Sequence, residues 1–529
     1  MTKVLVIGSG GAGLVAALSA VNAGAEVVVA SKTAPTRSQT SMAQGGINAA
    51  IGENDSIEKH FSDTLKSAGG LADENQIRVL CENAPKAIEW LYNLGMPFSV
   101  NDDKLAQRRL GGASSDRSCY ASDYTGLKLL HTLYDASIKA NIEFKNNYML
   151  LNLIVESNRV LGANFLVIES GEVEEIRADS VILATGGYAK IYGVHSTNAS
   201  TATGDGLAAA IRAGAKLANM EFIQFHPTAL KNSSILISES ARGSGGYLLN
   251  HKHERFTDEL DSRDVVARAI AKELENGDVY LDIRHLGSDF IEKELPQEAK
   301  LAQIYEGVDV TSELIAIKPA AHYSMGGILV DSDCKSSVDG LFAVGECAYH
   351  KTHGANRLGG NSLLELVVFG QIAGKEASEY AAKNQSSNIE SEQYNRDRNF
   401  INGVMYFTNQ IDFYQKRTML SNIFYSNIGV FREDMAMKSV LGAIRQMQRE
   451  LPFMGPRDKS KVQNTNLVEF IEFGNMLELS EIIVVSAISR AESRGAHYRV
   501  DIPQQNDVMF GANSISWKED GVLCADFIK

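Results

Sequence analysis

The chain begins with Lys3-Val-Leu-Val-Ile-Gly8-Ser-Gly10-Gly-Ala-Gly13, an apolar strand that runs into a GxGxxG turn. A helical run follows at residues 14–23, and a second apolar strand at 26–30. Glycines at such a turn let the backbone approach a pyrophosphate at the helix N-terminus. A lone GxGxxG is a weak signal, but this setting of strand, turn, helix and strand predicts a Rossmann-like dinucleotide-binding domain.

The end of the second strand narrows the kind of dinucleotide. Ser31 and Lys32 stand where a nicotinamide-binding fingerprint usually has a carboxylate for the adenine ribose. We therefore expect other groups to contact the ribose. A structural glycine turn without a ligand is the simpler alternative.

Further strands return the chain to this domain. Residues 180–187 and 340–346 are each an apolar strand that ends in a glycine turn, and Glu346 is placed to bind ribityl or ribose hydroxyls. Between these and the first turn, residues 36–47 form a polar, glycine-punctuated segment of the kind that lines a site. Residues 56–96 are predicted to be helical, and strands are expected at 147–169.

A second glycine-rich stretch, His353-Gly-Ala-Asn-Arg357-Leu-Gly-Gly-Asn361-Ser362-Leu363, leads into an apolar run that ends at Gly370. Asn361 or Ser362 is well placed to cap a helix that begins near Leu363. The N-terminus of a buried helix suits an anion or a carbonyl oxygen that gains charge. Arg357 adds a planar fork that fits a carboxylate or phosphate, although a surface salt bridge is the simpler interpretation.

The composition is typical of a globular protein of two or three domains, with 529 residues, 44% of them hydrophobic and 22% charged. A formal net charge of −14 and a pI near 5.4 argue against nucleic acid as the main partner. The five cysteines form no CxxC pair and no zinc spacing, so we expect this chain to hold no metal and no iron–sulfur cluster.

The sequence also predicts where in the cell the protein lies. Met1-Thr-Lys3 runs directly into the first strand without a charged leader, and apolar runs such as 482–485 are too short to span a bilayer. We therefore expect a cytoplasmic protein, or one that is peripheral to the inner face of the cell membrane through partner subunits.

Besides the first glycine turn, the chain carries further short motifs: Ala43-Gln-Gly-Gly-Ile47, Ala184-Thr-Gly-Gly187, Gln224-Phe-His226-Pro-Thr228, Ser262-Arg263-Asp264, Ala321-His322-Tyr-Ser-Met-Gly-Gly327, His353-Gly-Ala-Asn-Arg357, Asn361-Ser362-Leu363 and Glu492-Ser-Arg-Gly-Ala-His497. So many motifs in one order are far more specific than any single one. Through them the sequence, from residue 4 to about residue 500, resembles the flavoprotein subunit of fumarate reductase and succinate dehydrogenase, a family that includes L-aspartate oxidase.

The resemblance implies an α/β fold with a Rossmann-like FAD-binding domain, an inserted α+β capping domain that closes over a small dicarboxylate, and a C-terminal helical domain. The shift to irregular segments rich in His, Arg and Gly near residue 219, and to helical periodicity near 395, places the boundaries. We expect the FAD-binding domain at 1–218 and 326–395, the capping domain at 219–325, and the helical domain with a short tail at 396–529.

The resemblance also implies roles for individual residues. His226, His322 and Arg357 would hold the substrate carboxylates together with Ser238, and Arg263 would deliver a proton. Glu239 and Arg242 match the proton-relay positions of the family. Either histidine could alone be a core residue, but their joint match to one constellation favours the functional interpretation. The residues expected to bind FAD are Gly8, Gly10, Gly11, Ala12, Gly13, Ser31, Lys32, Ser38, Gln39, Thr40, Gln44, Gly45, Gly46, Ala184, Thr185, Gly186, Asp205, Glu346, Ser362 and Leu363.

Three departures from the family pattern refine the prediction. Gln39 stands where respiratory members attach FAD to a histidine, so we expect non-covalent FAD with a lower potential, which favours fumarate reduction. Leu110 stands where L-aspartate oxidases carry a glutamate that meets the substrate ammonium, which argues against an amino-acid substrate. The 32 residues after His497 are fewer than in most respiratory members, which leaves the docking surface for an iron–sulfur subunit open.

These observations favour a fumarate reductase flavoprotein that takes electrons from a separate iron–sulfur partner. L-aspartate oxidase, which works alone, is the alternative among enzymes, and succinate dehydrogenase is a weaker one. A non-catalytic FAD-carrying scaffold is the alternative from another class. Retention of His226, His322, Arg263 and Arg357 argues against a scaffold, which has no use for that set.

Overall fold

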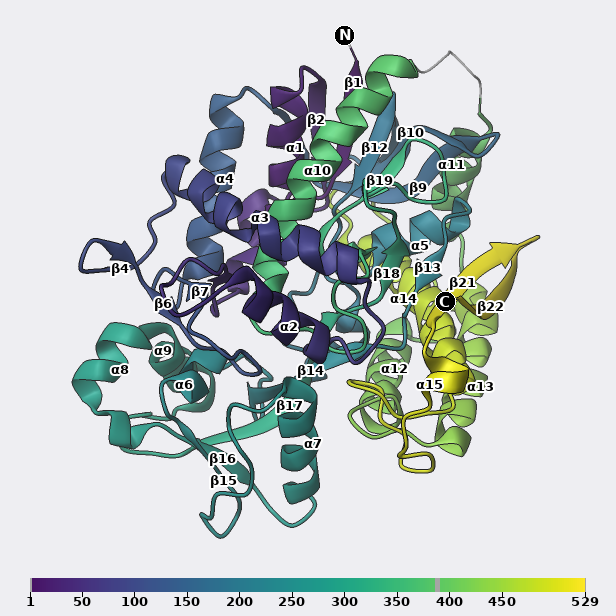
Figure 1. The fold of residues 1–529 in the computed structure, drawn as a ribbon. Helices are drawn as coiled ribbons and strands as arrows, with labels where there is room; N and C mark the ends of the chain where they lie inside the picture. The colour runs from purple at the N-terminus through teal and green to yellow at the C-terminus, as the bar shows by residue number, and fades with distance from the viewer. Residues whose placement is uncertain (1, 386–390, 529) are drawn as a thin grey trace.

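The computed structural model describes residues 2–385 and 391–528 (Figure 1). Its centre is a five-stranded parallel sheet in the order β19-β12-β1-β2-β8. The strands are β1 (Lys3–Ile7), β2 (Glu26–Ser31), β8 (Glu143–Asn146), β12 (Ser180–Leu183) and β19 (Leu341–Ala343). The inner strands carry runs of buried apolar residues, 4–7, 27–30 and 181–183, because both faces of a parallel sheet are covered.

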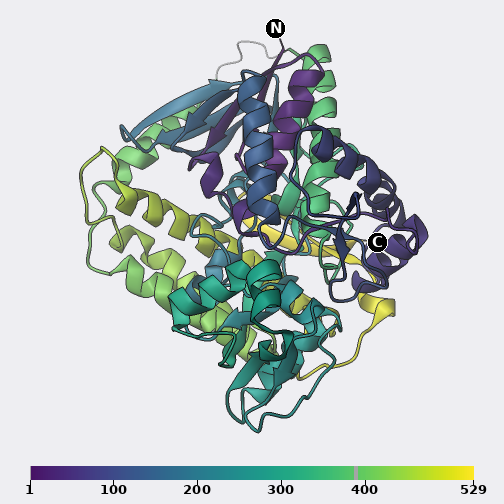
Figure 2. The ribbon, with the colours of Figure 1, turned by 90° about the vertical axis from the view of Figure 1, so that its left-hand side faces the viewer.

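Two helices pack side by side on this sheet, α1 (Gly11–Asn22) and α10 (Asn361–Lys383) (Figures 1 and 2). Their close approach depends on a small residue, because a Cβ at Gly374 would lie 2.2 Å from Ala16 O. α4 (Thr125–Lys139) packs beside α1. The N-termini of α1 and α10 therefore lie at the same region of the sheet. This region lines the site described below.

Two local predictions need correction. Residues 56–96 form two helices, α2 (Ile57–Ser67) and α3 (Glu74–Asn93), because Gly69 and Gly70 between them adopt φ of +61° and +79°. α10 begins at Asn361 with Gly360 as its N-cap, at φ +85° and without a side-chain cap. The Asn361 amide instead donates to Thr64 Oγ1 at 2.9 Å.

An antiparallel sheet, β9 (Tyr148–Glu156), β10 (Arg159–Val167) and β11 (Glu172–Arg177), lies next to the parallel sheet. It is covered in part by α5 (Asp205–Arg212) and by α11 (Gln393–Val404). The expected strands at 147–169 are therefore β9 and β10.

A separate lobe, called the cap below, consists of β14 to β17 and α6 to α9. It lies at the bottom of Figures 1 and 2 and has an apolar core of its own. Its antiparallel sheet has the order β14-β17-β16-β15. The elements are β14 (Ile223–Leu230), α6 (Glu239–Gly243), β15 (Tyr247–Leu249), α7 (Arg263–Glu273), β16 (Val279–Asp282), α8 (Ser288–Glu294), α9 (Pro296–Glu306) and β17 (Ile315–Ser324).

The C-terminal part is helical, as expected, in α12 (Phe413–Asn427), α13 (Asp434–Glu450) and α14 (Thr465–Ser489). The tail then adds α15 (Asp507–Phe510) and a hairpin of β21 (Asn513–Glu519) and β22 (Val522–Ile528), which the sequence analysis did not predict. β21 pairs with β13 (Leu217–Ala218), so the tail extends a sheet that begins in the first half of the chain. Ser514 and Ser516 of β21 face inward although they are polar, so the sequence lacks the alternation of apolar residues that predicts a strand.

Short elements complete the described chain, and within it no helix is long and apolar enough to cross a membrane. The short strands are β3 (Ile47–Asn48), β4 (Val100–Asn101), β5 (Lys104–Leu105), β6 (Gln107–Arg108), β7 (Ser118–Cys119), β18 (Gly327–Leu329) and β20 (Ala348–Tyr349). The 3-10 helices are Pro35–Arg37, Gln39–Met42, Ala189–His195, Arg284–Leu286, Gly345–Cys347 and Leu451–Phe453. The fold class is as predicted; the exact domain boundaries stay predictions.

Candidate active site

One long cavity runs from the glycine turn after β1 to the cap. Almost every residue predicted for the site lines it. The exceptions lie behind its wall: Gly13, where a Cβ would sit 2.0 Å from Gly8 O, and Arg242, which is buried beside Glu239. The lining residues from the prediction are Gly8, Gly10, Gly11, Ala12, Ser31, Lys32, Ser38, Gln39, Thr40, Gln44, Gly45, Gly46, Ala184, Thr185, Gly186, Asp205, His226, Ser238, Glu239, Arg263, His322, Glu346, Arg357, Ser362 and Leu363.

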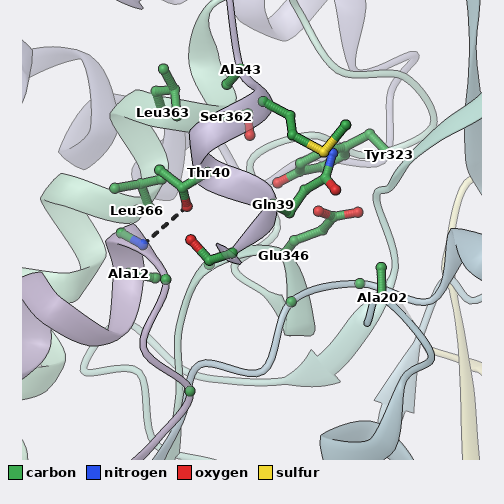
Figure 3. Close-up of a pocket in the computed structure, with 18 of the residues that line it drawn as sticks. Ala12, Gln39, Thr40, Ala43, Ala202, Tyr323, Glu346, Ser362, Leu363 and Leu366 are labelled. Carbon is green, nitrogen blue, oxygen red and sulfur yellow. Dashed lines mark hydrogen bonds between the residues drawn. The ribbon is translucent and has the colours of Figure 1, made fainter. Parts of the chain in front are cut away.

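The first glycine turn has no room for side chains. Gly8 adopts φ +113°, and a Cβ there would lie 2.2 Å from Ala184 O. The next helix begins at Gly11, whose N–H donates to Thr40 Oγ1 at 3.0 Å (Figure 3). The backbone and a helix N-terminus therefore line the cavity directly at this point. Such an arrangement is the usual binding site of a pyrophosphate.

The Lys32 side chain is held in the cavity wall by two ion pairs. Its Nζ donates to Asp205 Oδ2 at 2.6 Å and to Glu472 Oε1 at 2.7 Å. Burial lowers the pKa of Lys32, but the two carboxylate charges outweigh burial and raise that pKa above its ordinary value. The ion pairs join the segment after β2 to α5 and α14, so the residue expected to contact the cofactor also holds these parts together.

Two buried polar atoms of the cavity wall, Ser38 Oγ and Gln44 Oε1, have no hydrogen-bond partner among the described residues. Buried polar groups are normally paired, so these atoms suit a polar ligand such as FAD. Figure 3 shows Ser362, Leu363 and Leu366 of α10 on one side of the pocket and Gln39, Tyr323 and Glu346 on another.

Gln39 and Glu346 are held in defined positions in this pocket. Gln39 Oε1 accepts from Ala199 N at 2.6 Å, and Glu346 Oε1 accepts from Ser324 N at 2.9 Å. Burial raises the pKa of Glu346 to about 7, while the Ser324 hydrogen bond and Arg357 act in the opposite direction. A carboxyl group in this position can accept from hydroxyl groups, as its predicted contact with ribityl or ribose hydroxyls requires.

At the cap end, Glu239 links two arginines. Arg263 donates to Glu239 Oε2 from NH2 at 2.6 Å and from Nε at 3.1 Å, and Arg242 NH2 lies 3.4 Å from Oε1. Gly111 N donates to the same Oε1 at 3.1 Å. Burial raises the pKa of Glu239, but the charges of Arg263 and Arg242 prevail and hold it below its ordinary value. Glu239 is therefore an ionised bridge between the two guanidinium groups.

Arg357 faces the same space from the stretch that precedes α10. Its guanidinium lies over the Tyr323 ring at 4.2 Å, and its buried Nε has no hydrogen-bond partner in the part of the chain that the structure describes. Burial, and then the charge of Arg263, lower the pKa of Arg357 to about 10. A cation in this environment gains from an added anion.

Gln224 connects the two arginines that face the cavity. Its Oε1 accepts from Arg263 NH1 at 3.0 Å and from Arg357 NH2 at 3.1 Å. Its Nε2 donates to Asn356 Oδ1 and Arg357 O, both at 2.8 Å, which fixes the amide orientation. The sequence analysis quoted Gln224 within a motif but gave it no role, and Tyr323 was missed in the same way.

The two histidines lie close together, with ring centroids 5.0 Å apart. His226 Nδ1 accepts from Thr228 N at 3.3 Å, so the neutral ring carries its hydrogen on Nε2. His322 Nδ1 is 2.8 Å from Thr197 Oγ1. Burial, followed by the charge of Arg263, lowers both pKa values well below the ordinary range. Both rings are neutral donors or acceptors, and Ser238 at the start of α6 lines the space beside them.

The charged groups that line this end of the cavity leave a positive surplus. Arg263 and Arg357 face Glu239, both histidines are neutral, and Arg242 adds a third guanidinium behind the wall. A small anion compensates that surplus. A dinucleotide cradle that opens onto such a pocket defines an FAD-dependent oxidoreductase that acts on a small anionic substrate.

Comparison with known proteins identifies the family. The FAD binding domain model matches residues 3–363, and the model of the fumarate reductase flavoprotein C-terminus matches residues 417–523. The chain is 39% identical to the succinate dehydrogenase flavoprotein subunit of Rickettsia conorii, over 95% of this chain and 91% of that protein. It is 38% identical to the 8-methylmenaquinol:fumarate reductase flavoprotein subunit of Wolinella succinogenes, over 97% and 88% of the two chains.

Comparison with solved structures supports the same family assignment. An E. coli quinol fumarate reductase flavoprotein superposes with a TM-score of 0.95, at 33% identity over 100% of this chain and 97% of that one. The chain belongs to the fumarate reductase and succinate dehydrogenase flavoprotein family, and it is an FAD-dependent oxidoreductase of that type. The family, the cofactor FAD and the enzyme class predicted from the sequence are confirmed, and the comparisons do not favour L-aspartate oxidase.

Proposed function

We propose that this chain reduces fumarate to succinate with non-covalently bound FAD. The observation that carries the proposal is the meeting of Arg263, Arg357 and two neutral histidines at the cap end of the cavity. The reaction adds a hydride to one alkene carbon and a proton to the other. FAD, when bound and reduced, supplies the hydride.

The clamp for the substrate uses groups that the protein already orients. Arg357 offers a planar fork, and its unpartnered Nε is free to donate to a carboxylate oxygen. His226 offers Nε2–H, and His322 stands 5.0 Å from it, between centroids, on the same wall. Donors that polarise one carboxylate draw electron density from the alkene and ease hydride addition at the opposite carbon.

Arg263 is the proposed proton donor. A guanidinium hardly deprotonates in isolation, so the donation must be concerted with its recharging. Glu239 accepts two hydrogen bonds from Arg263 and is linked to Arg242, which donates through NH1 to Glu259 O. This chain of groups gives Arg263 a route for reprotonation through Glu239 and Arg242.

Gln39 supports the direction of the reaction. A glutamine cannot form a histidyl link to the flavin, and loss of that electron-withdrawing link lowers the flavin potential. Leu110 supports the choice of substrate, because it is 2% exposed and a Cβ at Gly359 would lie 3.3 Å from Leu110 Cβ. An apolar side chain next to the site gives an ammonium group no partner, which favours fumarate over L-aspartate.

Electrons come, in this proposal, from a separate iron–sulfur subunit. The described residues contain no group of His, Cys, Asp and Glu arranged to hold a metal ion. The relatives named above are themselves called flavoprotein subunits. Association with such a partner would place the protein at the inner face of the cell membrane.

The purified FAD-loaded chain tests the proposal with a low-potential artificial donor. Fumarate-dependent oxidation of the donor should exceed succinate oxidation, and L-aspartate should release negligible peroxide. Aspartate-dependent peroxide release at a rate comparable to fumarate turnover would instead support an L-aspartate oxidase.

A further inference from the structure

Two buried carboxyl groups meet where the cap touches the flavin-binding part of the chain. Asp123 lies in the turn before α4, and Glu298 lies in the first turn of α9. Both side chains are fully buried, at 0% exposure, and the Glu298 carboxyl lies close to that of Asp123. The two residues are 175 positions apart in the sequence, so only the folded arrangement of the two parts brings them together.

The hydrogen bonds of each group indicate how the pair is charged. Asp123 Oδ2 accepts from Gln297 N at 2.5 Å, at the N-terminus of α9, where a negative charge is stabilised. Glu298 Oε1 accepts from Ser240 Oγ at 3.4 Å. The remaining oxygens, Asp123 Oδ1 and Glu298 Oε2, are buried and receive no donor from another residue. One proton held between the two carboxyl groups supplies the missing donor to both.

Other ionisable groups around the pair do not replace that proton. Arg108 of β6 is buried nearby, but its guanidinium donates to three carbonyl oxygens, of Gln44, Gly45 and Ser122. Glu294 and Lys293 of α8, together with Tyr120 and Tyr124, are the further titratable groups that face this region. None of them makes a hydrogen bond or ion pair with Glu298 among the described residues.

The pair joins two parts of the catalytic apparatus. Thr125 Oγ1, two residues after Asp123, donates to Gln44 O at 3.3 Å, and Gly126 N donates to Ala43 O at 2.7 Å. Ser240, on the other side, follows Glu239 in α6. The contact therefore connects the loop that lines the FAD cavity with the cap helix that carries the proton relay.

We propose that Asp123 and Glu298 form a proton-dependent clasp, in which closing the cap over the substrate takes up one proton that the two carboxyl groups share. The inference rests on the proposed function and on the expectation, stated with the sequence, that the cap closes over the dicarboxylate. Opening the cap exposes both groups to water and releases the proton. Closure is then easier at low pH than at high pH.

The direction of the Glu298 pKa shift agrees with this dependence of cap closure on pH. Burial, and then the hydrogen bond and charge of Asp123, raise the pKa of Glu298 well above its ordinary value. The closed form therefore holds a proton that the open form loses. The contribution to closure is complete below the open-state pKa and is lost as pH rises from there through the closed-state pKa.

Infrared spectroscopy of the FAD-loaded protein saturated with malonate, so that the cap is closed, tests the shared proton. The difference spectrum between wild type and Glu298→Gln at pH 7 should contain the carbonyl stretch of one un-ionised carboxylic acid. Glu294→Gln, which removes a carboxylate from the neighbouring helix, should not produce that signal. A difference spectrum that contains only carboxylate bands would overturn the proposal.

Binding of malonate, a dicarboxylate that cannot be reduced, tests the link to closure through the flavin absorbance. From pH 6.5 to 9 the affinity of the wild type should fall more steeply than that of Glu298→Gln, by up to about tenfold per pH unit. The glutamine amide donates to Asp123 without titrating, so the variant should bind malonate at least as tightly at pH 9. Asp123→Asn, whose amide can donate to an ionised Glu298, should flatten the profile as well. Equal slopes in wild type and Glu298→Gln would overturn the clasp.

The two readouts separate this inference from the proposed function. If the chain proves inactive with fumarate while the infrared band and the pH profile behave as expected, the clasp stands and the assignment of the reaction fails. If fumarate turns over but Glu298→Gln shows neither change, the clasp fails and the proposed function stands.

Discussion

Arg263 donates two hydrogen bonds to one oxygen of Glu239, from NH2 at 2.6 Å and from Nε at 3.1 Å. Its NH1 is bound to Gln224 Oε1 instead. The guanidinium is thus fixed by two neighbours, with 7% of the residue exposed to the cavity. Because Glu239 also contacts Arg242, the proposed donor is held and recharged by the same carboxylate.

Arg263→Ala should abolish fumarate turnover while leaving the fold and FAD binding intact. Loss of a positioned acid costs on the order of a hundred- to ten-thousand-fold in rate, and water cannot easily enter a closed site to replace it. Steady-state kinetics and the flavin spectrum of the variant measure both quantities. Arg268→Ala, on the same helix and partly exposed, is the matched control and should stay active. An Arg263→Ala protein with most of its fumarate turnover would refute the role of proton donor.

Arg357→Ala should impair substrate binding as well as rate, because a carboxylate clamp acts in the ground state and the transition state alike. A hydrogen bond to a charged group contributes roughly 1.5–3 kcal/mol, so KM should rise about ten- to a hundredfold. Arg357→Lys keeps the charge but loses the planar fork, and should recover only part of the affinity. If KM is unchanged and only kcat falls, Arg357 is not part of the clamp.

The sequence predicts the nucleotide-binding part of the fold well because its signals are local. β1, α1 and β2 follow each other within 31 residues, and buried parallel strands are apolar throughout. The break between α2 and α3 was missed because Gly69 and Gly70 are also tolerated within helices. The final hairpin was missed because buried serines interrupt the apolar pattern of β21.

The residues of the site were predicted from motifs. The residues that this prediction missed are those whose role depends on contacts with residues far away in the sequence. Gln224 bridges two arginines, yet a lone glutamine in an apolar strand carries no signal of that role until the fold brings Arg263 and Arg357 to it. Asp123 and Glu298 belong to different lobes and to no common motif. Their contact exists only once the fold has brought the two lobes together.

The flavin should be released on acid denaturation, because the Gln39 side chain cannot form a covalent histidyl link. Precipitation of the protein with acid should leave the yellow flavin in the supernatant and a pellet without fluorescence under ultraviolet light. A flavoprotein with covalently attached FAD, treated in parallel, should keep its fluorescence in the pellet. Fluorescent flavin that stays with this polypeptide would contradict the prediction.

The stability of the FAD-loaded protein should depend on pH through His60, which is buried below the start of α10. His60 Nε2 donates to Asn361 Oδ1 at 2.9 Å, and its Nδ1 is buried without a partner. Burial lowers the pKa of His60 to about 4 from an ordinary value of 6.5. The unfolded chain therefore takes up a proton at this residue as pH falls below 6.5, whereas the folded protein does not until pH 4.

The contribution of His60 is fully present above pH 6.5 and is lost as pH falls towards 4, by up to about 3 kcal/mol. His60→Gln removes this titration along with the hydrogen bond to Asn361. The variant should melt below wild type at pH 7.5, and the difference in Tm should narrow towards pH 5. His131→Gln, at an exposed position of α4, is the control and should show the same small difference at both pH values. A His60→Gln difference that is independent of pH would show that His60 titrates in the folded protein as it does in the unfolded chain.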